Sequence, residues 1–154
     1  MPKEHHYRTH LIWTGAASGP TASYDSYSRD YTIEIEGKPS FTGSADPTFR
    51  GDPALHNPED LLVMALSACH MLSYLAECAR AGIRVLSYSD EANGTMSWLD
   101  GKVRFKEVFL HPRVVIAEGG DLNKALELHH KAHEGCFIAS SVSFPVRHEA
   151  AVNV

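Results

Sequence analysis

The sequence predicts a single α+β domain with an antiparallel-rich sheet and two main helices, the longer of which is buried. Three observations support this class. Strand-like patterns fill the first part of the chain, a long uncharged segment (Leu61–Ala76) reads as a core helix, and a second helix precedes the last strand. At 154 residues, with 44% hydrophobic and 21% charged residues, the chain has the length and composition of one globular domain. We therefore expect residues 1–154 to form one domain.

The N-terminal part is expected to contain three strands. Tyr7–Trp13 is rich in β-branched and aromatic residues, Tyr31–Glu36 alternates apolar and acidic side chains, and Phe41–Ala45 is a shorter candidate. The next segment, Asp46–His56, holds two prolines and one glycine, so we predict a loop without regular structure there.

The central helix has clear start and stop signals. Asn57 is a favourable N-cap, Pro58 suits the first helical position, and the carboxylate of Glu59 complements the positive end of the helix. Gly82 is expected to end the helix after about residue 81.

The remaining elements follow from alternation and turn residues. An Asp-Gly pair at 100–101 is typical of a tight hairpin turn, and Asp121 and Gly135 flank a second helix. The predicted elements are the strands Ile83–Tyr88, Ala92–Leu99 and Val103–Ile116, the helix Leu122–Glu134, and the strand Val142–His148.

Charge and hydropathy exclude two classes of partner. The net charge is −5 and basic residues are scattered, which argues against nucleic-acid binding. The uncharged segment is 16 residues long and includes Ser67 and His70, whereas a membrane span needs about 20 apolar residues. The N-terminal residues show no apolar secretory segment, so we expect a cytoplasmic protein with reduced thiols.

Two cysteines in separate contexts are the main candidates for chemistry. Cys69 lies inside the uncharged helix, and Cys136 follows the second helix after Gly135. Most buried thiols are inert, but a pair brought together from distant segments fits a nucleophile and its resolving partner. Cys78 is nine residues from Cys69, on the other side of the same helix and about 13 Å along it, so we expect a packing role for it.

A buried thiol needs a cation nearby to form the reactive thiolate. Arg50, in the loop before the central helix, is the candidate, and Glu59 would hold its guanidinium through a bidentate pair. On spacing alone, a surface loop arginine and an acidic helix cap are the favoured explanation of these two residues.

The segment HNPEDLLVMALSACH (56–70) resembles the central helix of the OsmC/Ohr family, named for osmotically inducible protein C and organic hydroperoxide resistance. In that family an Asn-Pro-Glu begins the helix and the peroxidatic cysteine follows the glutamate by ten residues, as Cys69 follows Glu59. The second family cysteine matches Cys136, and an arginine shortly before the Asn-Pro-Glu matches Arg50 in the OsmC-like branch. Arg29 is a rival, because the Ohr branch carries its arginine nearer the N-terminus.

The resemblance implies a thiol peroxidase that reduces organic hydroperoxides, with hydrogen peroxide as a second candidate substrate, in oxidative-stress defence. Cys69 would form a sulfenate and Cys136 would close a disulfide with it. A lipoyl-type or other dithiol would be the reductant, with no metal or organic cofactor. The family also implies an intertwined homodimer.

Helix geometry gives a separate reason to expect two subunits at the site. Glu59 and Cys69 are ten residues apart, hence about 15 Å apart along the helix axis and about 80° apart around it. One arginine side chain can hardly contact both the Glu59 carboxylate and the Cys69 sulfur when they lie on the same helix. An antiparallel second copy would bring its own glutamate to Cys69.

Two other readings stay open. His129 and His133 have the i, i+4 spacing of helical metal ligands, so a non-enzymatic protein that holds a metal with Cys136, or that binds a small apolar ligand, is the alternative. A cysteine-histidine hydrolase around Cys69 is also conceivable, but it has no evident third residue and leaves Cys136 unexplained.

Overall fold

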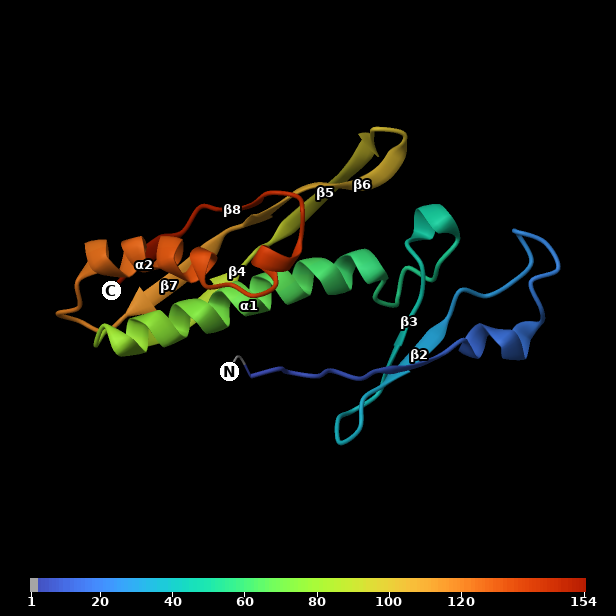
Figure 1. The fold of residues 1–154 in the computed structure, drawn as a ribbon, viewed down its shortest axis with the longest axis horizontal. Coiled ribbons are helices and arrows are strands. Elements are labelled where there is room, and N and C mark those ends of the chain that lie inside the picture. The colour runs from blue at the N-terminus through green and yellow to red at the C-terminus, as the bar shows by residue number, and fades with distance from the viewer. Residues whose placement is uncertain (1–2) are drawn as a thin grey trace. The chain divides into compact units, whose positions relative to one another are not determined.

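The computed structural model describes residues 3–154 and confirms the α+β class (Figure 1). It consists of two compact units, an N-terminal one that ends at Leu61 and a C-terminal one, Leu62–Val154, and each is described by itself. The strands are β1 (His10–Ile12), β2 (Tyr31–Glu34), β3 (Phe41–Gly43), β4 (Val85–Asp90), β5 (Asn93–Leu99), β6 (Lys102–Leu110), β7 (Pro112–Ile116), β8 (Val146–His148) and β9 (Ala151–Asn153). The α-helices are α1 (Pro58–Arg80) and α2 (Leu122–Glu134), and the 3-10 helices are η1 (Thr14–Ser18), η2 (Pro47–Phe49) and η3 (Ala139–Ser141).

The N-terminal unit contains the predicted three-stranded antiparallel sheet, in the order β1-β2-β3. The prediction that Asp46–His56 has no regular structure is wrong, because this segment contains η2. The Asp46 side chain accepts a hydrogen bond from the Thr48 N–H at 2.7 Å, and Pro47 has the backbone angle that a helical first turn needs.

The long helix α1 begins and ends where the sequence predicts. The Asn57 side chain accepts a hydrogen bond from the Asp60 N–H (2.8 Å), and the Asp60 carboxylate accepts one from the Asn57 N–H (3.3 Å). This reciprocal pair satisfies two of the free donors at the start of the helix. At the other end Gly82 has a φ of +73°, a left-handed conformation that favours glycine and stops the helix.

In the C-terminal unit, α1 is buried along one face instead of all round. The side chains at four-residue spacing, Leu66, His70, Tyr74 and Cys78, are buried, whereas Leu72 is 62% exposed. The helix is long and apolar enough to cross a membrane, but core helices of soluble proteins meet the same criterion. Its buried face packs into the protein core described below.

The C-terminal unit has two sheets, β4-β7-β9 and β5-β6-β8, and both combine antiparallel and parallel pairs. The predicted single strand Val103–Ile116 is divided into β6 and β7. Pro112 cannot donate to a ladder, and the His111 N–H donates to the Asp90 carboxylate (2.6 Å) instead of to a strand. The short strand β9 was not predicted. The turn at Asp100-Gly101 is confirmed, with φ values of +50° and +78°.

The main core lies where α1, α2 and the sheet β4-β7-β9 meet. It joins Tyr74 and Cys78 of α1 to Ala125, Leu128 and Ala132 of α2 and to Val114 and Ile116 of β7. Helix α2 begins at Asp121, whose carboxylate accepts the Lys124 N–H at 2.9 Å, as predicted. Because α2 packs on α1, the segment after the C-terminal end of α2 comes close to the middle of α1.

Candidate active site

Cys69 lies on α1 at the wall of a pocket of about 470 Å³ in the C-terminal unit. The wall on α1 is formed by Cys69, Leu72, Ser73, Ala76, Glu77 and Arg80, and the opposite wall by Lys131, Ala132, Gly135 and Phe137. Cys69 is half-buried, whereas Phe137 at the rim of the pocket is 81% exposed. An apolar molecule can therefore approach the Cys69 sulfur between α1 and the end of α2.

The structure brings Cys136 to the Cys69 thiol. Cys136 follows α2 after Gly135 and is almost fully buried, and its sulfur accepts a 3.5 Å hydrogen bond from the Ala139 N–H. Burial, and then a side-chain hydrogen bond with Cys69, raise the pKa of the Cys136 thiol to about 11. Both thiols are free, as is the buried Cys78. The two thiols therefore lie close enough for Cys69 to affect the Cys136 thiol, although 67 residues separate them in the sequence.

The charged end of the Cys69 pocket was not predicted. Glu77 makes ion pairs with Lys131 of α2 (2.5 Å) and Arg80 (2.6 Å), and these bonds lower the pKa of the Glu77 carboxyl. The sequence does contain a signal for it. Arg80 follows Cys69 by eleven residues, which is three helical turns, so both side chains lie on one side of α1.

The two candidate arginines belong to the N-terminal unit and differ in how they are held. Arg50 ends η2 with a φ of +66°, and its guanidinium pairs with Asp25 at 3.0 Å in an exposed site. Arg29 stacks on the rings of Tyr27 (3.8 Å) and Tyr24 (4.9 Å) and donates to their backbone carbonyls. Arg29 is therefore fixed within its own loop, whereas Arg50 has a single surface partner.

Glu59 is in the first turn of α1, as predicted. One of its carboxylate oxygens is buried and has no hydrogen-bond partner among residues 3–154, and the same holds for the Tyr31 hydroxyl. Burial, and then the negative charges of Glu59 and Asp60, raise the pKa of that hydroxyl. Within the described part of one protomer no ion pair joins Glu59 to Arg50. In the described part of one protomer the Arg50 guanidinium pairs with Asp25 instead.

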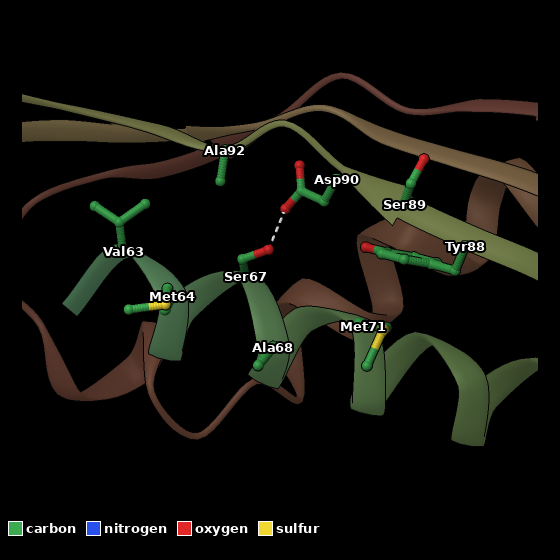
Figure 2. A pocket seen from close by; sticks show the side chains of 9 residues that line it. All are labelled: Val63, Met64, Ser67, Ala68, Met71, Tyr88, Ser89, Asp90 and Ala92. Carbon is green, nitrogen blue, oxygen red and sulfur yellow. Dashed lines mark hydrogen bonds between the residues drawn. The ribbon is translucent and has the colours of Figure 1, made fainter. Parts of the chain in front are cut away.

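A second pocket, of about 510 Å³, lies on the side of α1 away from Cys69 (Figure 2). Figure 2 shows the hydroxyl of Ser67 pointing to the Asp90 carboxylate, with Val63, Met64, Ala68 and Met71 along the helix and Tyr88, Ser89 and Ala92 opposite. The Ser67–Asp90 hydrogen bond is 2.5 Å long. No cysteine lines this pocket.

The comparisons with known proteins identify the family. A family model described as OsmC-like protein matches residues 51–150, which include both cysteines and the start of α1. This chain belongs to the OsmC-like family. A protein of Bacillus subtilis strain 168, the uncharacterized protein YmaD, is 26% identical over 89 residues, which span 56% of this chain and 59% of YmaD.

Solved structures share the fold of this OsmC-like protein over nearly its whole length. An OsmC-like protein of unknown function from Vibrio cholerae is 34% identical, with a TM-score of 0.87 and coverage of 96% of this chain and 100% of that one. An organic hydroperoxide resistance protein from Legionella pneumophila is 21% identical, with a TM-score of 0.67 and coverage of 98% and 100%. The organic hydroperoxide resistance protein OhrB of Bacillus subtilis is 19% identical, with a TM-score of 0.67 and coverage of 96% and 98%.

In this OsmC-like protein each histidine of the metal hypothesis packs against a different histidine. His129 contacts His70 in the core, and His133 packs against His148. Within residues 3–154, no group of three or more His, Cys, Asp or Glu side chains is arranged to hold a metal ion. The metal alternative therefore has no ligand set in the described part of the chain.

Proposed function

We propose that this OsmC-like protein is a cysteine-based thiol peroxidase that reduces organic hydroperoxides, with hydrogen peroxide as a second candidate substrate, in oxidative-stress defence. The observation that carries the proposal is the proximity of the Cys69 and Cys136 thiols beside a pocket with apolar walls and one charged end. The organic hydroperoxide resistance proteins of similar fold support it. The proposal takes residues 1–154 as one OsmC-like domain that acts in the cytoplasm as a homodimer, without a cofactor.

The proposed reaction has three stages: oxidation of Cys69, formation of the disulfide, and reduction of the disulfide. The Cys69 thiolate attacks the terminal oxygen of the hydroperoxide, an S–O bond forms, the O–O bond breaks, and the alkoxide leaves as the alcohol after it takes up a proton. The Cys136 sulfur then attacks the Cys69 sulfenic acid. An S–S bond forms, and the hydroxyl leaves as water with the Cys136 proton. A lipoyl-type or other dithiol reduces the disulfide through two exchange steps and becomes a disulfide itself.

In this proposal Cys69 is the nucleophile, because it is less buried than Cys136 and lines the pocket. Cys136 suits the resolving role, since its raised pKa keeps it a thiol at neutral pH. Arg50, positioned by Glu59 of the partner subunit, supplies the charge that favours the Cys69 thiolate. Arg29 is the alternative for this role.

The decisive experiment measures the consumption of cumene hydroperoxide by metal-free protein with a dithiol reductant. Cys69→Ser should abolish turnover. Cys136→Ser should still form a sulfenate that a dimedone probe traps, but should not close a disulfide. Cys78→Ser is the matched control, because Cys78 is buried away from the pocket, and its activity should be close to that of the unmodified protein. Full activity in Cys69→Ser would overturn the proposal.

A non-enzymatic protein that binds a small apolar ligand is the second candidate, and the pocket beside Asp90 is the observation that favours it. The two functions give different results in the same assay. Protein without hydroperoxide turnover, but with a ligand whose affinity falls in Met71→Trp, would support the binding function.

A further inference from the structure

Two buried histidines join α1 to α2 beside the cysteine pair. His70 directly follows Cys69, His129 lies in α2, and each side chain is 1% exposed. The Nε2 atom of His70 and the Nδ1 atom of His129 are 3.1 Å apart. A neutral imidazole has one donor and one acceptor nitrogen, so one ring donates this hydrogen bond and the other accepts it.

The ring of His129 is also held on its faces. It lies parallel to the Tyr74 ring, with centroids 3.8 Å apart and an angle of 10°, and parallel to the His70 ring at 5.4 Å and 9°. The Tyr74 hydroxyl donates a 3.1 Å hydrogen bond to the Ala125 carbonyl, one turn before His129. Two successive turns of α1 are therefore tied to two successive turns of α2.

The bond between the two imidazoles is their only polar link among residues 3–154. The outer nitrogens, Nδ1 of His70 and Nε2 of His129, are buried without hydrogen-bond partners there. Burial is the largest cause that lowers the pKa of His70 to about 4 and that of His129 to about 3. Both rings are thus neutral at pH 7, so each keeps one donor and one acceptor nitrogen for this hydrogen bond.

We infer that His70 and His129 are positioning residues for the Cys69–Cys136 pair, an inference that rests on the proposed function. The bond sets the rotation of α1 next to Cys69, and it does so against the helix whose end carries Cys136. A disulfide tolerates only a narrow range of sulfur positions and dihedral angles. A loosened α1–α2 contact therefore lowers the effective concentration of one thiol at the other and makes the disulfide less stable.

The test measures the reduction potential of the Cys69–Cys136 couple in mixtures of reduced and oxidised dithiothreitol, with thiol alkylation and peptide mass mapping. His129→Leu removes the hydrogen bond at similar volume, and we expect at least a tenfold shift toward the dithiol, or about 30 mV less negative. His129→Asn keeps a polar amide close to the position of Nδ1, and we expect a shift of no more than about threefold. The inference is overturned if the leucine variant shifts the equilibrium by less than about threefold, or if both variants shift it equally.

Two further variants separate positioning from loss of stability. His70→Leu breaks the same bond from α1 and gives a second measurement if His129→Leu does not fold. Tyr74→Phe removes the hydroxyl bond to Ala125 and leaves the histidine bond in place, so its potential should match that of the unmodified protein although the protein unfolds more readily. The titration uses no hydroperoxide. A protein with the expected shifts but no peroxidase activity would therefore overturn the proposed function and leave the positioning role standing.

Discussion

At the scale of single residues, the site combines two thiols that differ in their exposure to substrate. Cys69 lines an open pocket, whereas Cys136 is enclosed by the turn that follows α2 and accepts a hydrogen bond from the Ala139 N–H. The nucleophile of a two-cysteine peroxidase has to be reached by substrate, and the resolving thiol only has to reach the nucleophile. The difference in environment thus agrees with the proposed order of the two steps.

The arginine that activates Cys69 can be identified with two alanine variants. Arg50→Ala should slow peroxide reduction about tenfold or more, because it removes a permanent charge that would favour the thiolate form of the nucleophile. The Arg50–Asp25 pair is exposed, so its loss should hardly change folding stability. Arg29→Ala, by contrast, should affect the rate only mildly. Thiol titration and rapid-mixing kinetics measure both effects, and the reverse ranking would assign the role to Arg29.

The buried histidine pair predicts how stability depends on pH. An exposed histidine titrates near 6.5, whereas burial lowers the pKa of His70 to about 4 and that of His129 to about 3. At pH values between the folded and the unfolded pKa, the unfolded chain binds more protons than the folded chain. The free energy of unfolding therefore falls as the pH drops below 6.5. The loss from pH 7 to pH 4.5 should be on the order of 2 kcal/mol for each imidazole.

Urea unfolding at several pH values measures this dependence. His129→Asn removes one titrating group and should reduce the slope between pH 4.5 and 6.5 by about half. His130→Asn is the matched control, because His130 is exposed on the same helix, and it should leave the slope unchanged. Equal slopes in all three proteins would show that the His129 imidazole does not drive the dependence.

At the scale of elements, both α-helices depend on side-chain caps that the sequence displays. Asn57→Ala should lower the free energy of unfolding by about 1 kcal/mol, because it leaves the Asp60 N–H without a partner at the start of α1. The same substitution at Asn123, an exposed position in α2, should change it by less than about 0.5 kcal/mol. Chemical denaturation compares the two, and equal losses would contradict the capping role.

Other element boundaries depend on partners that are distant in sequence. The break between β6 and β7 occurs where the His111 N–H turns to Asp90, 21 residues earlier. Strand β9 has only three residues and exists through its parallel pairing with β7. Local patterns carry no information on such partners, because a short strand has no intrinsic stability outside its sheet.

At the scale of the whole molecule, we expect a homodimer with active sites that use both subunits. The α1 face that carries Leu72 and Met64 is exposed in the single chain, which favours a partner surface. Sedimentation should give twice the 17.0 kDa mass of one chain. A monomer at assay concentrations would contradict this expectation.

Mixed dimers test whether Glu59 acts on the Cys69 of its partner. Glu59→Ala and Cys69→Ser are each expected to be inactive or nearly so. Co-expression of the two should restore about a quarter of the unmodified activity, since half of the dimers are mixed and each mixed dimer holds one complete site. If Glu59 acted within its own chain, the mixture would be no more active than its components.

The sequence by itself determined the features that depend on local interactions. These are the start and end of α1, the cap of α2, the turn at Asp100-Gly101, and the membership of the OsmC-like family that the comparisons confirm. Caps, left-handed glycines and helical spacing are set by neighbours within one or two turns, so they can be read from the chain directly.

Only the tertiary structure decided which distant side chains meet. The contact of Cys136 with Cys69, the His70–His129 bond and the Glu77–Lys131 ion pair all form across the packing of α2 on α1. Each joins residues at least 54 positions apart, and the register of two packed helices depends on their whole buried faces. The sequence therefore indicated the two cysteines as candidates, and the packing of the helices determined which side chains are paired.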